Sequence, residues 1–296
     1  MRLTVLTTCL LLCINSSLAT AQDTETVSTT QVREHVYMLQ GNGGNIGISV
    51  GDDGIFMIDD QYAPMTPQIR EAIAAISDEP LRFILNTHWH QDHTGGNENF
   101  GSSGAIIVAH DNVRKRMSSE QFIAAFNKKV PASPAGALPV VTFSDTVTFH
   151  LNGDTVHAFH VNNGHTDGDT VIRFRQANVI HTGDIYFNGL YPFIDVSSGG
   201  SVDGVIKALD RILRLANDDT RIIPGHGPLG DKAGLSEYRD MLKHIRDGVQ
   251  KLITQGKTLE QIQANRPTAD YDDEWGNGFI SPDAFVAIVY SSLTAD

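Results

Sequence analysis

Four metal-ligand side chains occur within six residues, in the segment His88-Trp89-His90-Gln91-Asp92-His93. The short apolar run Leu81–Leu85 precedes them and predicts a β-strand that ends just before the segment. We therefore expect these side chains on a loop at the edge of a sheet, where functional groups usually lie. Neutral imidazole and carboxylate are ligands that suit zinc or iron. A polar loop with incidental histidines is the weaker interpretation, because this spacing rarely arises by chance.

Three more ligand-type residues follow predicted strands in the second half of the chain. His165, Asp184 and His226 each stand beside a glycine, directly after an apolar run. Glycine allows a turn in which the backbone approaches a bound ion closely. Each residue alone is a weak signal, but together with the first segment they make up a ligand set for two metal ions.

The order of these residues resembles that of the metallo-β-lactamase superfamily of metallohydrolases, over about residues 32–230. The resemblance implies an α/β fold, a four-layer α/β–β/α sandwich, with the metals at the edge shared by its two sheets. It implies a first metal on His88, His90 and His165, a second on Asp92, His93 and His226, and a bridge between them at Asp184. Asp59, which follows the predicted strand Ile55–Ile58, resembles an acid that supports the histidines from behind.

The residue at the bridging position separates the branches of this superfamily. Zinc β-lactamases with a cysteine ligand carry a thiolate where this sequence has Asp184, and its two cysteines, Cys9 and Cys13, lie far from any ligand position. A bridging aspartate instead resembles the hydrolases of thioesters, lactones and phosphodiesters. Flavodiiron oxidoreductases of this fold have glutamate where His90 stands. The resemblance favours two Zn²⁺ ions per chain, with iron and manganese as alternatives.

We expect an exported dinuclear zinc hydrolase that attacks a carbonyl with a metal-bridging hydroxide. A lactone similar to an acyl-homoserine lactone, or a related ester, is the favoured small-molecule substrate. Two dications lower the pKa of a shared water toward neutrality, and Asp92 is expected to orient it and to pass on its proton. Tyr186 or Asn188 could donate to the oxyanion, with packing inside the loop as the alternative. Some relatives have tyrosine where Phe187 stands.

Three other functions are compatible with the same residues. Hydrolysis of β-lactams requires the same nucleophile in an open groove. A persulfide dioxygenase uses a similar motif with a single iron, and a non-catalytic metal-binding protein would hold metal without turning over any substrate. Residues 231–296 carry no motif of the family that would choose among these functions.

The N-terminus predicts a signal peptide over residues 1–21. A positive start at Arg2, an apolar run over 3–14 and the small residues Ala19 and Ala21 fit such a peptide. The run is shorter than the roughly 20 residues that span a bilayer. We expect a periplasmic or secreted protein with a single metallo-β-lactamase-fold domain over 22–296 and no membrane attachment after cleavage. With 22 basic against 35 acidic residues, no nucleic-acid partner is expected.

Local patterns predict the main helices and turns. Apolar residues at helical spacing predict helices over 202–216 and 234–254, and residues 111–127 are also predicted to be helical. Ser281-Pro282 predicts the start of a last helix. Asn152-Gly153 predicts a two-residue hairpin turn, and residues 131–139 a surface loop.

Overall fold

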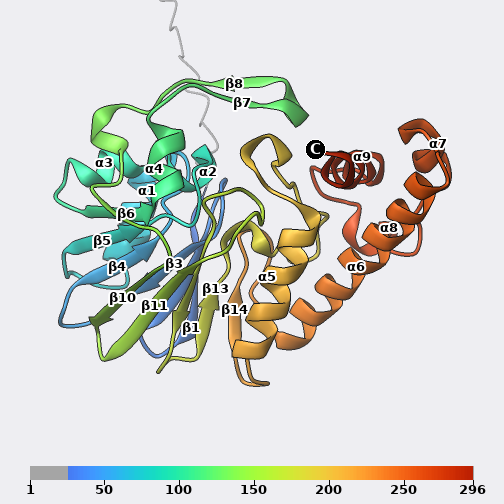
Figure 1. The fold of residues 1–296 in the computed structure, drawn as a ribbon. Coiled ribbons are helices and arrows are strands. Elements are labelled where there is room, and N and C mark those ends of the chain that lie inside the picture. The colour runs from blue at the N-terminus through green and yellow to red at the C-terminus, as the bar shows by residue number, and fades with distance from the viewer. Residues whose placement is uncertain (1–25, 296) are drawn as a thin grey trace, which may run out of the picture.

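The computed structural model describes residues 26–295, so the predicted signal peptide and both cysteines lie outside the described residues. Two mixed β-sheets face each other in the left part of Figure 1, and helices cover their outer sides. This arrangement confirms the predicted α/β–β/α sandwich. None of the helices in the described part of the chain combines the length and the apolar character needed to cross a membrane.

The first sheet has seven strands in the order β1-β2-β3-β4-β5-β6-β9, of which the last four run parallel. Their bounds are β1 Ser28–Arg33, β2 Val36–Gln40, β3 Ile46–Ser49, β4 Ile55–Ile58, β5 Leu81–Leu85, β6 Ile106–His110 and β9 Val141–Phe143. Successive side chains of a strand point to opposite faces. In β4, Phe56 and Ile58 therefore pack toward the second sheet, whereas Ile55 and Met57 pack under helix α1 (Thr66–Ala74).

The second sheet has six strands in the order β10-β11-β12-β13-β14-β15, and β13 and β14 are parallel neighbours. Their bounds are β10 Thr146–Leu151, β11 Asp154–His160, β12 Thr170–Phe174, β13 Val179–His181, β14 Arg221–Ile223 and β15 Gly230–Asp231. Asn152 and Gly153 join β10 to β11 with φ angles of 53° and 72°. These angles confirm the predicted two-residue turn, which requires positive φ at both positions.

The helices divide between the two outer faces. On the side of the first sheet lie α1, α2 (Gln91–Thr94), α3 (Asn97–Gly101) and α4 (Asp111–Met117). On the other side lie α5 (Val202–Leu215), α6 (Lys232–Thr254), α7 (Leu259–Ala264), α8 (Asp272–Trp275) and α9 (Pro282–Thr294). Leu209 of α5, Leu242 of α6 and Val289 of α9 share one hydrophobic cluster with Val171 of β12. The motif-free residues after 231 thus extend the outer layer of the second sheet.

The predicted helix over 111–127 is wrong in its second half. Helix α4 ends at Met117, and the chain continues as a hairpin of β7 (Gln121–Ile123) and β8 (Lys128–Val130). A short 3₁₀ turn, η2 (Ala124–Phe126), joins the two strands, and Asn127 closes it with a φ of 48°. Ser118 and Ser119 end the helix, because serine competes for backbone hydrogen bonds.

Candidate metal centre

The candidate site lies where the loops of both sheets meet at one edge. His88 follows β5, and Asp184 and His226 follow the parallel neighbours β13 and β14, whose carboxyl ends lie side by side. His165 follows β11. Backbone hydrogen bonds join the two halves here, because Thr170 N–H donates to the Thr87 carbonyl at 2.8 Å. The structure thus brings all seven predicted ligands into one place.

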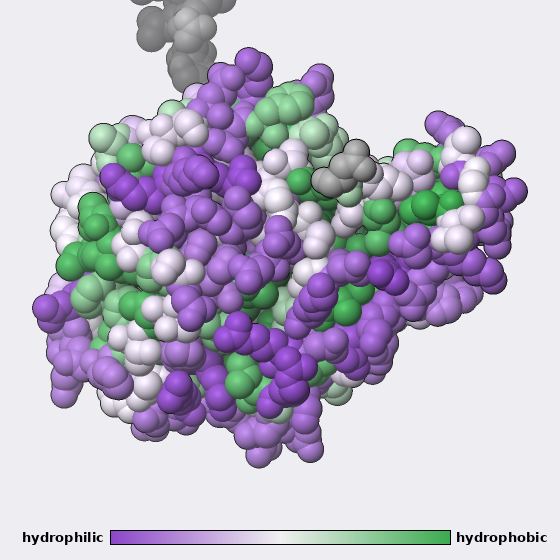
Figure 2. Space-filling model, viewed as in Figure 1, coloured by the Kyte–Doolittle hydropathy of each residue, from purple (hydrophilic) through white to green (hydrophobic). Residues whose placement is uncertain are grey.

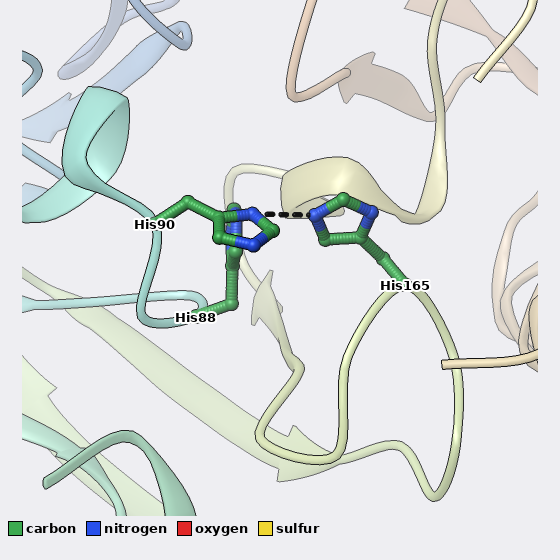
Figure 3. A group of neighbouring side chains, drawn as sticks. All are labelled: His88, His90 and His165. Carbon is green, nitrogen blue, oxygen red and sulfur yellow. Dashed lines mark hydrogen bonds between the residues drawn. The ribbon is translucent and has the colours of Figure 1, made fainter. Parts of the chain in front are cut away.

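Three imidazoles converge in the first group (Figure 3). His90 Nδ1 lies 3.0 Å from His88 Nε2 and 2.9 Å from His165 Nε2. All three side chains are buried. This is the trio that the resemblance assigned to the first metal, and three nitrogens aimed at one point are the usual protein contribution to a catalytic zinc site.

The second group combines two imidazoles with a carboxylate. Asp92 Oδ2 lies 3.3 Å from His226 Nε2 and 3.5 Å from His93 Nε2. His93 is fully buried, whereas the side chains of Asp92 and His226 are 22% and 21% exposed. The solvent-facing part of the site therefore lies on this side.

Asp184 lies between the two groups. Its Oδ1 is 3.1 Å from His93 Nε2, and its Oδ2 is 3.5 Å from Nε2 of both His165 and His226. Oδ2 also lies 3.8 Å from His88 Nε2. One carboxylate thus faces the histidines of both groups, which is the position of a bridging ligand.

The outer nitrogen of each buried imidazole has its own hydrogen-bond acceptor. His93 Nδ1 donates to Asp59 Oδ2 at 2.8 Å, and His165 Nδ1 donates to the Phe193 carbonyl at 2.8 Å. The Thr87 hydroxyl donates to Asp59 and accepts from His88 Nδ1 at 3.0 Å. These bonds fix the tautomer that leaves Nε2 free to bind a metal.

His90 presents its Nδ1 to the site, whereas the other histidines of the two groups present Nε2. Its Nε2 donates to Asp195 Oδ2 at 3.1 Å, which leaves Nδ1 toward the site. Asp59 thus accepts a hydrogen bond from a ligand histidine, as expected. Thr87 and Asp195 do the same for two other ligand histidines. Sequence reasoning did not find Asp195, because it belongs to no ligand-type spacing and lies 105 residues after His90 in the chain.

The charges at the site are arranged for a cation. Burial lowers the pKa of His165 to about 4 and that of His88 well below its ordinary value, so both rings are neutral at pH 7. Burial raises the pKa of Asp184, but the charges of His93 and His226 outweigh this and hold it well below its ordinary value. Burial lowers the pKa of His226, yet Asp184 and Asp92 together raise it to about 9. The carboxylates are thus ionised beside positive charge, which a divalent ion can supply in place of protons.

The residues fit a pair of divalent ions. His93 Nε2 and Asp184 Oδ1 are buried and have no hydrogen-bond partner, although they lie only 3.1 Å apart. A buried polar atom without a partner is costly unless a metal or another group binds it. The ligand atoms in each group lie within 4.8 Å of one another, and imidazole with carboxylate suits zinc, iron or manganese.

Tyr186 is not placed to act on a substrate, contrary to the prediction. Its side chain is fully buried and its ring packs against Tyr238 of α6, with 5.0 Å between the ring centroids. Its hydroxyl donates to Asn188 Oδ1 at 2.8 Å. Packing inside the loop, the alternative role, is therefore what the structure shows for this pair. Phe187 stacks on the His226 ring at 5.0 Å.

A cavity of about 340 Å³ opens above the exposed side of the site. The metal-ligand residues His90, Asp92, Asp184 and His226 form its floor. Its walls are mostly apolar and come from separate segments: Tyr62, Trp89, Ile123, Phe126, Val130, Phe193 and Phe279. Asn42 and Gln91 also line it, as does Lys128 of β8. The cavity can hold a small organic molecule against the candidate metal ligands.

Comparison with known proteins identifies relatives of this fold and site. The model of the metallo-β-lactamase superfamily matches residues 35–226. The chain is 22% identical over 231 residues to a type 2 metallo-β-lactamase of Bacillus cereus, covering 75% of this chain and 84% of that protein. It is 28% identical over 165 residues to a hydroxyacylglutathione hydrolase of a Polaromonas species, covering 55% of each.

Solved structures show the same fold. A metallo-β-lactamase from Pontibacter korlensis superposes with a TM-score of 0.61 at 20% identity, over 74% of this chain and 99% of that chain. The sec-alkylsulfatase Pisa1 from a Pseudomonas species superposes with a TM-score of 0.67 at 18% identity, over 90% of this chain and 50% of that one.

Proposed function

Because the chain belongs to the metallo-β-lactamase superfamily, we propose that it is an exported hydrolase that opens a lactone or a related ester with two Zn²⁺ ions. The position of Asp184 carries the proposal. Its carboxylate faces the histidines of both groups, so one side chain can hold two ions at the short separation that two-metal hydrolysis uses. When bound, such ions make a water molecule acidic near neutral pH and polarise a carbonyl.

Asp92 is the residue proposed to handle the proton. Burial raises its pKa, but the charge of His93 and the hydrogen bond from His226 outweigh this and hold the pKa below its ordinary value. The carboxylate is therefore ionised at neutral pH and can accept a proton. Its side chain is partly exposed and lines the cavity, so it can also hand that proton to a leaving group.

The absence of a thiolate ligand favours an ester or lactone. In the described residues 26–295 there is no cysteine, and the bridging position holds a carboxylate. The similarity to a protein named as a hydroxyacylglutathione hydrolase supports this choice. The similarity to a type 2 metallo-β-lactamase supports the second candidate, hydrolysis of a β-lactam in the same cavity.

A panel of substrates tests the proposal. The zinc-reconstituted protein is assayed against lactones, thioesters, phosphodiesters and β-lactams. Elemental analysis measures the metal content of the protein as purified and again after zinc reconstitution. We expect two zinc ions per chain and the highest kcat/KM with a lactone or ester. A higher kcat/KM with β-lactams would support the second candidate. One iron per chain with persulfide oxidation, or bound metal without any turnover, would contradict both.

Export is tested separately. The apolar run over 3–14 and the small residues before Gln22 motivate it. N-terminal sequencing of the protein from the extracytoplasmic fraction should find a start near Gln22. Full-length protein retained in the cytoplasm would contradict the proposal.

A further inference from the structure

The hairpin of β7 and β8 forms one wall of the cavity above the candidate metal centre. Ile123 pairs with Lys128, and Gln121 pairs with Val130. Directly paired residues of antiparallel strands point to the same face of the hairpin, and the next residue along points to the other face. Ile123, Lys128 and Val130 accordingly line the cavity, and Phe122 and Lys129 do not. In Figure 2, apolar surface gathers over the end of this hairpin.

Lys128 is the single lysine or arginine among the described residues that line this cavity. It has no ion pair in the part of the chain that the structure describes, whereas Lys129 next to it lies 3.0 Å from Glu120. The charge of Lys128 is available to a molecule in the cavity.

The hairpin is held in place by hydrogen bonds to the loops of the site. At its turn, Ala124 N–H donates to the Ser197 hydroxyl, which donates in turn to Asp195 Oδ1 at 2.5 Å. Asp195 is the acceptor of the metal-ligand residue His90. The turn of the hairpin is therefore connected to the metal centre through two side chains.

The base of the hairpin is anchored as well. Arg116 Nη1 donates to Gln121 Oε1 at 3.0 Å, and Arg116 forms a bidentate ion pair with Asp167 in the loop that carries His165. At the other end, Phe126 packs on Phe193 with 4.7 Å between the ring centroids. These contacts fix the side of the cavity on which the Lys128 ammonium lies.

We propose that Lys128 selects substrates that carry a carboxylate near the bond to be cleaved. The ammonium group donates charge-assisted hydrogen bonds to such a carboxylate, and the apolar walls exclude part of the competing water. The inference rests on the proposed hydrolase function and specifies its substrate class: a small ester or lactone with one anionic group and an apolar body. Lys128 is a specificity residue and takes no part in the chemical step.

Two chromogenic esters with one leaving group provide the test. Mono-4-nitrophenyl succinate carries a terminal carboxylate, and 4-nitrophenyl butyrate is its neutral counterpart of equal chain length. kcat/KM for both is measured on the zinc-loaded wild type, Lys128→Gln, Lys128→Arg and the control Lys129→Gln, which changes the neighbouring lysine on the opposite face of the strand.

We expect Lys128→Gln to lower the succinate-to-butyrate ratio of kcat/KM about fivefold to twentyfold, chiefly through KM. Lys128→Arg should keep most of the preference, Lys129→Gln should keep all of it, and added salt should weaken it in the wild type. Equal changes for both esters, or an unchanged ratio in Lys128→Gln, would overturn the proposal.

A binding measurement separates this proposal from the hydrolase function. If the wild type hydrolyses neither ester, the substrate panel still decides the proposed hydrolase function, and the affinity of the metal-loaded proteins for glutarate decides the role of Lys128. Calorimetric titration should then show weaker binding to Lys128→Gln than to Lys129→Gln. Equal affinity of the two variants would overturn the role of Lys128 as well.

Discussion

The substitution Asp59→Asn should weaken the second metal position without unfolding the protein. Asp59 has a φ of 61°, a left-handed conformation that asparagine also adopts, so the backbone can stay as it is. The wild-type carboxylate accepts from the Thr87 backbone at 2.7 Å, from the Thr87 hydroxyl at 2.7 Å and from His93 Nδ1 at 2.8 Å. The side-chain amide of Asp59→Asn has one acceptor oxygen, so its NH₂ group must face at least one of the groups that donate to the wild-type carboxylate.

The easiest relief is a change of tautomer at His93. If Nδ1 accepts from the new amide, the proton moves to Nε2, the atom that faces Asp184 and the site. A protonated Nε2 cannot bind a metal. Loss of such a supporting contact typically weakens metal binding 10- to 100-fold, or about 1.4 to 2.7 kcal/mol. The lost hydrogen bonds should also lower the free energy of unfolding by about 1.5 to 3 kcal/mol.

Zinc titration against a chromogenic chelator measures the affinity of the protein for the first and for the second zinc ion. Asp154→Asn is the matched control, because Asp154 is also buried and accepts from Gln176 N–H and Ala177 N–H, far from the site. We expect Asp59→Asn to weaken the affinity for the second zinc ion by about 10- to 100-fold. Asp154→Asn should lower the melting temperature while keeping the affinities for both the first and the second zinc ion. If the two variants lose stability alike and bind zinc alike, Asp59 has no role in holding His93.

Asp184→Asn keeps the size of the side chain but removes a negative charge between two dications, so the second zinc should be lost first and kcat should fall by several orders of magnitude. Elemental analysis that finds both metals and a normal rate would refute the bridging position. Gly44→Ala would place a Cβ inside van der Waals contact with the His93 ring, so zinc occupancy of the second position should fall. Gly248→Ala would place its Cβ 3.7 Å from Pro267 Cβ and should not change that occupancy. Burial lowers the pKa of His181 to about 4, whereas the same ring in the unfolded chain has a pKa of about 6.5. The unfolded state therefore binds a proton first, so the free energy of unfolding is fully retained above pH 6.5 and falls as the pH drops toward 4. Between pH 7 and pH 4.5 the wild type should lose about 2.4 kcal/mol more than His181→Gln in urea unfolding, and equal losses would show that His181 does not contribute to acid sensitivity.

The ligand set could be predicted because coordination chemistry restricts residue type. Only a few side chains bind zinc, and they must leave strand ends on short turns to reach a common point. His165 and His226, more than 60 residues apart, could be placed together because each follows a predicted strand and stands beside a glycine. Two packed sheets could be predicted because strands cluster within each half of the sequence and helices flank them, and the resemblance to the superfamily supplied the four-layer sandwich.

The supporting residues could not be predicted in the same way. Asp195 meets His90 across 105 positions of the chain, and many residue types could accept one hydrogen bond from an imidazole. Tyr186 shows the opposite error, because its position beside a ligand in the chain suggested a role in the site. Its side chain points away from the metal ligands and packs against Tyr238 of α6. Side chains of residues close in sequence at a turn can point in different directions, as those of Asp184 and Tyr186 do.

The substrate side of the cavity depends on register rather than residue type. Residues 128 and 129 are both lysines. The predicted helix over 111–127 gave no indication that either lysine lies in a cavity. The pairing of Ile123 with Lys128 decides which one faces the candidate metal centre, and the left-handed turn at Asn127 sets that pairing. A shift of one residue would turn every side chain of the strand to the other face. If Lys128 acts as proposed, the substrate specificity of this site is set by a turn none of whose residues is a candidate metal ligand.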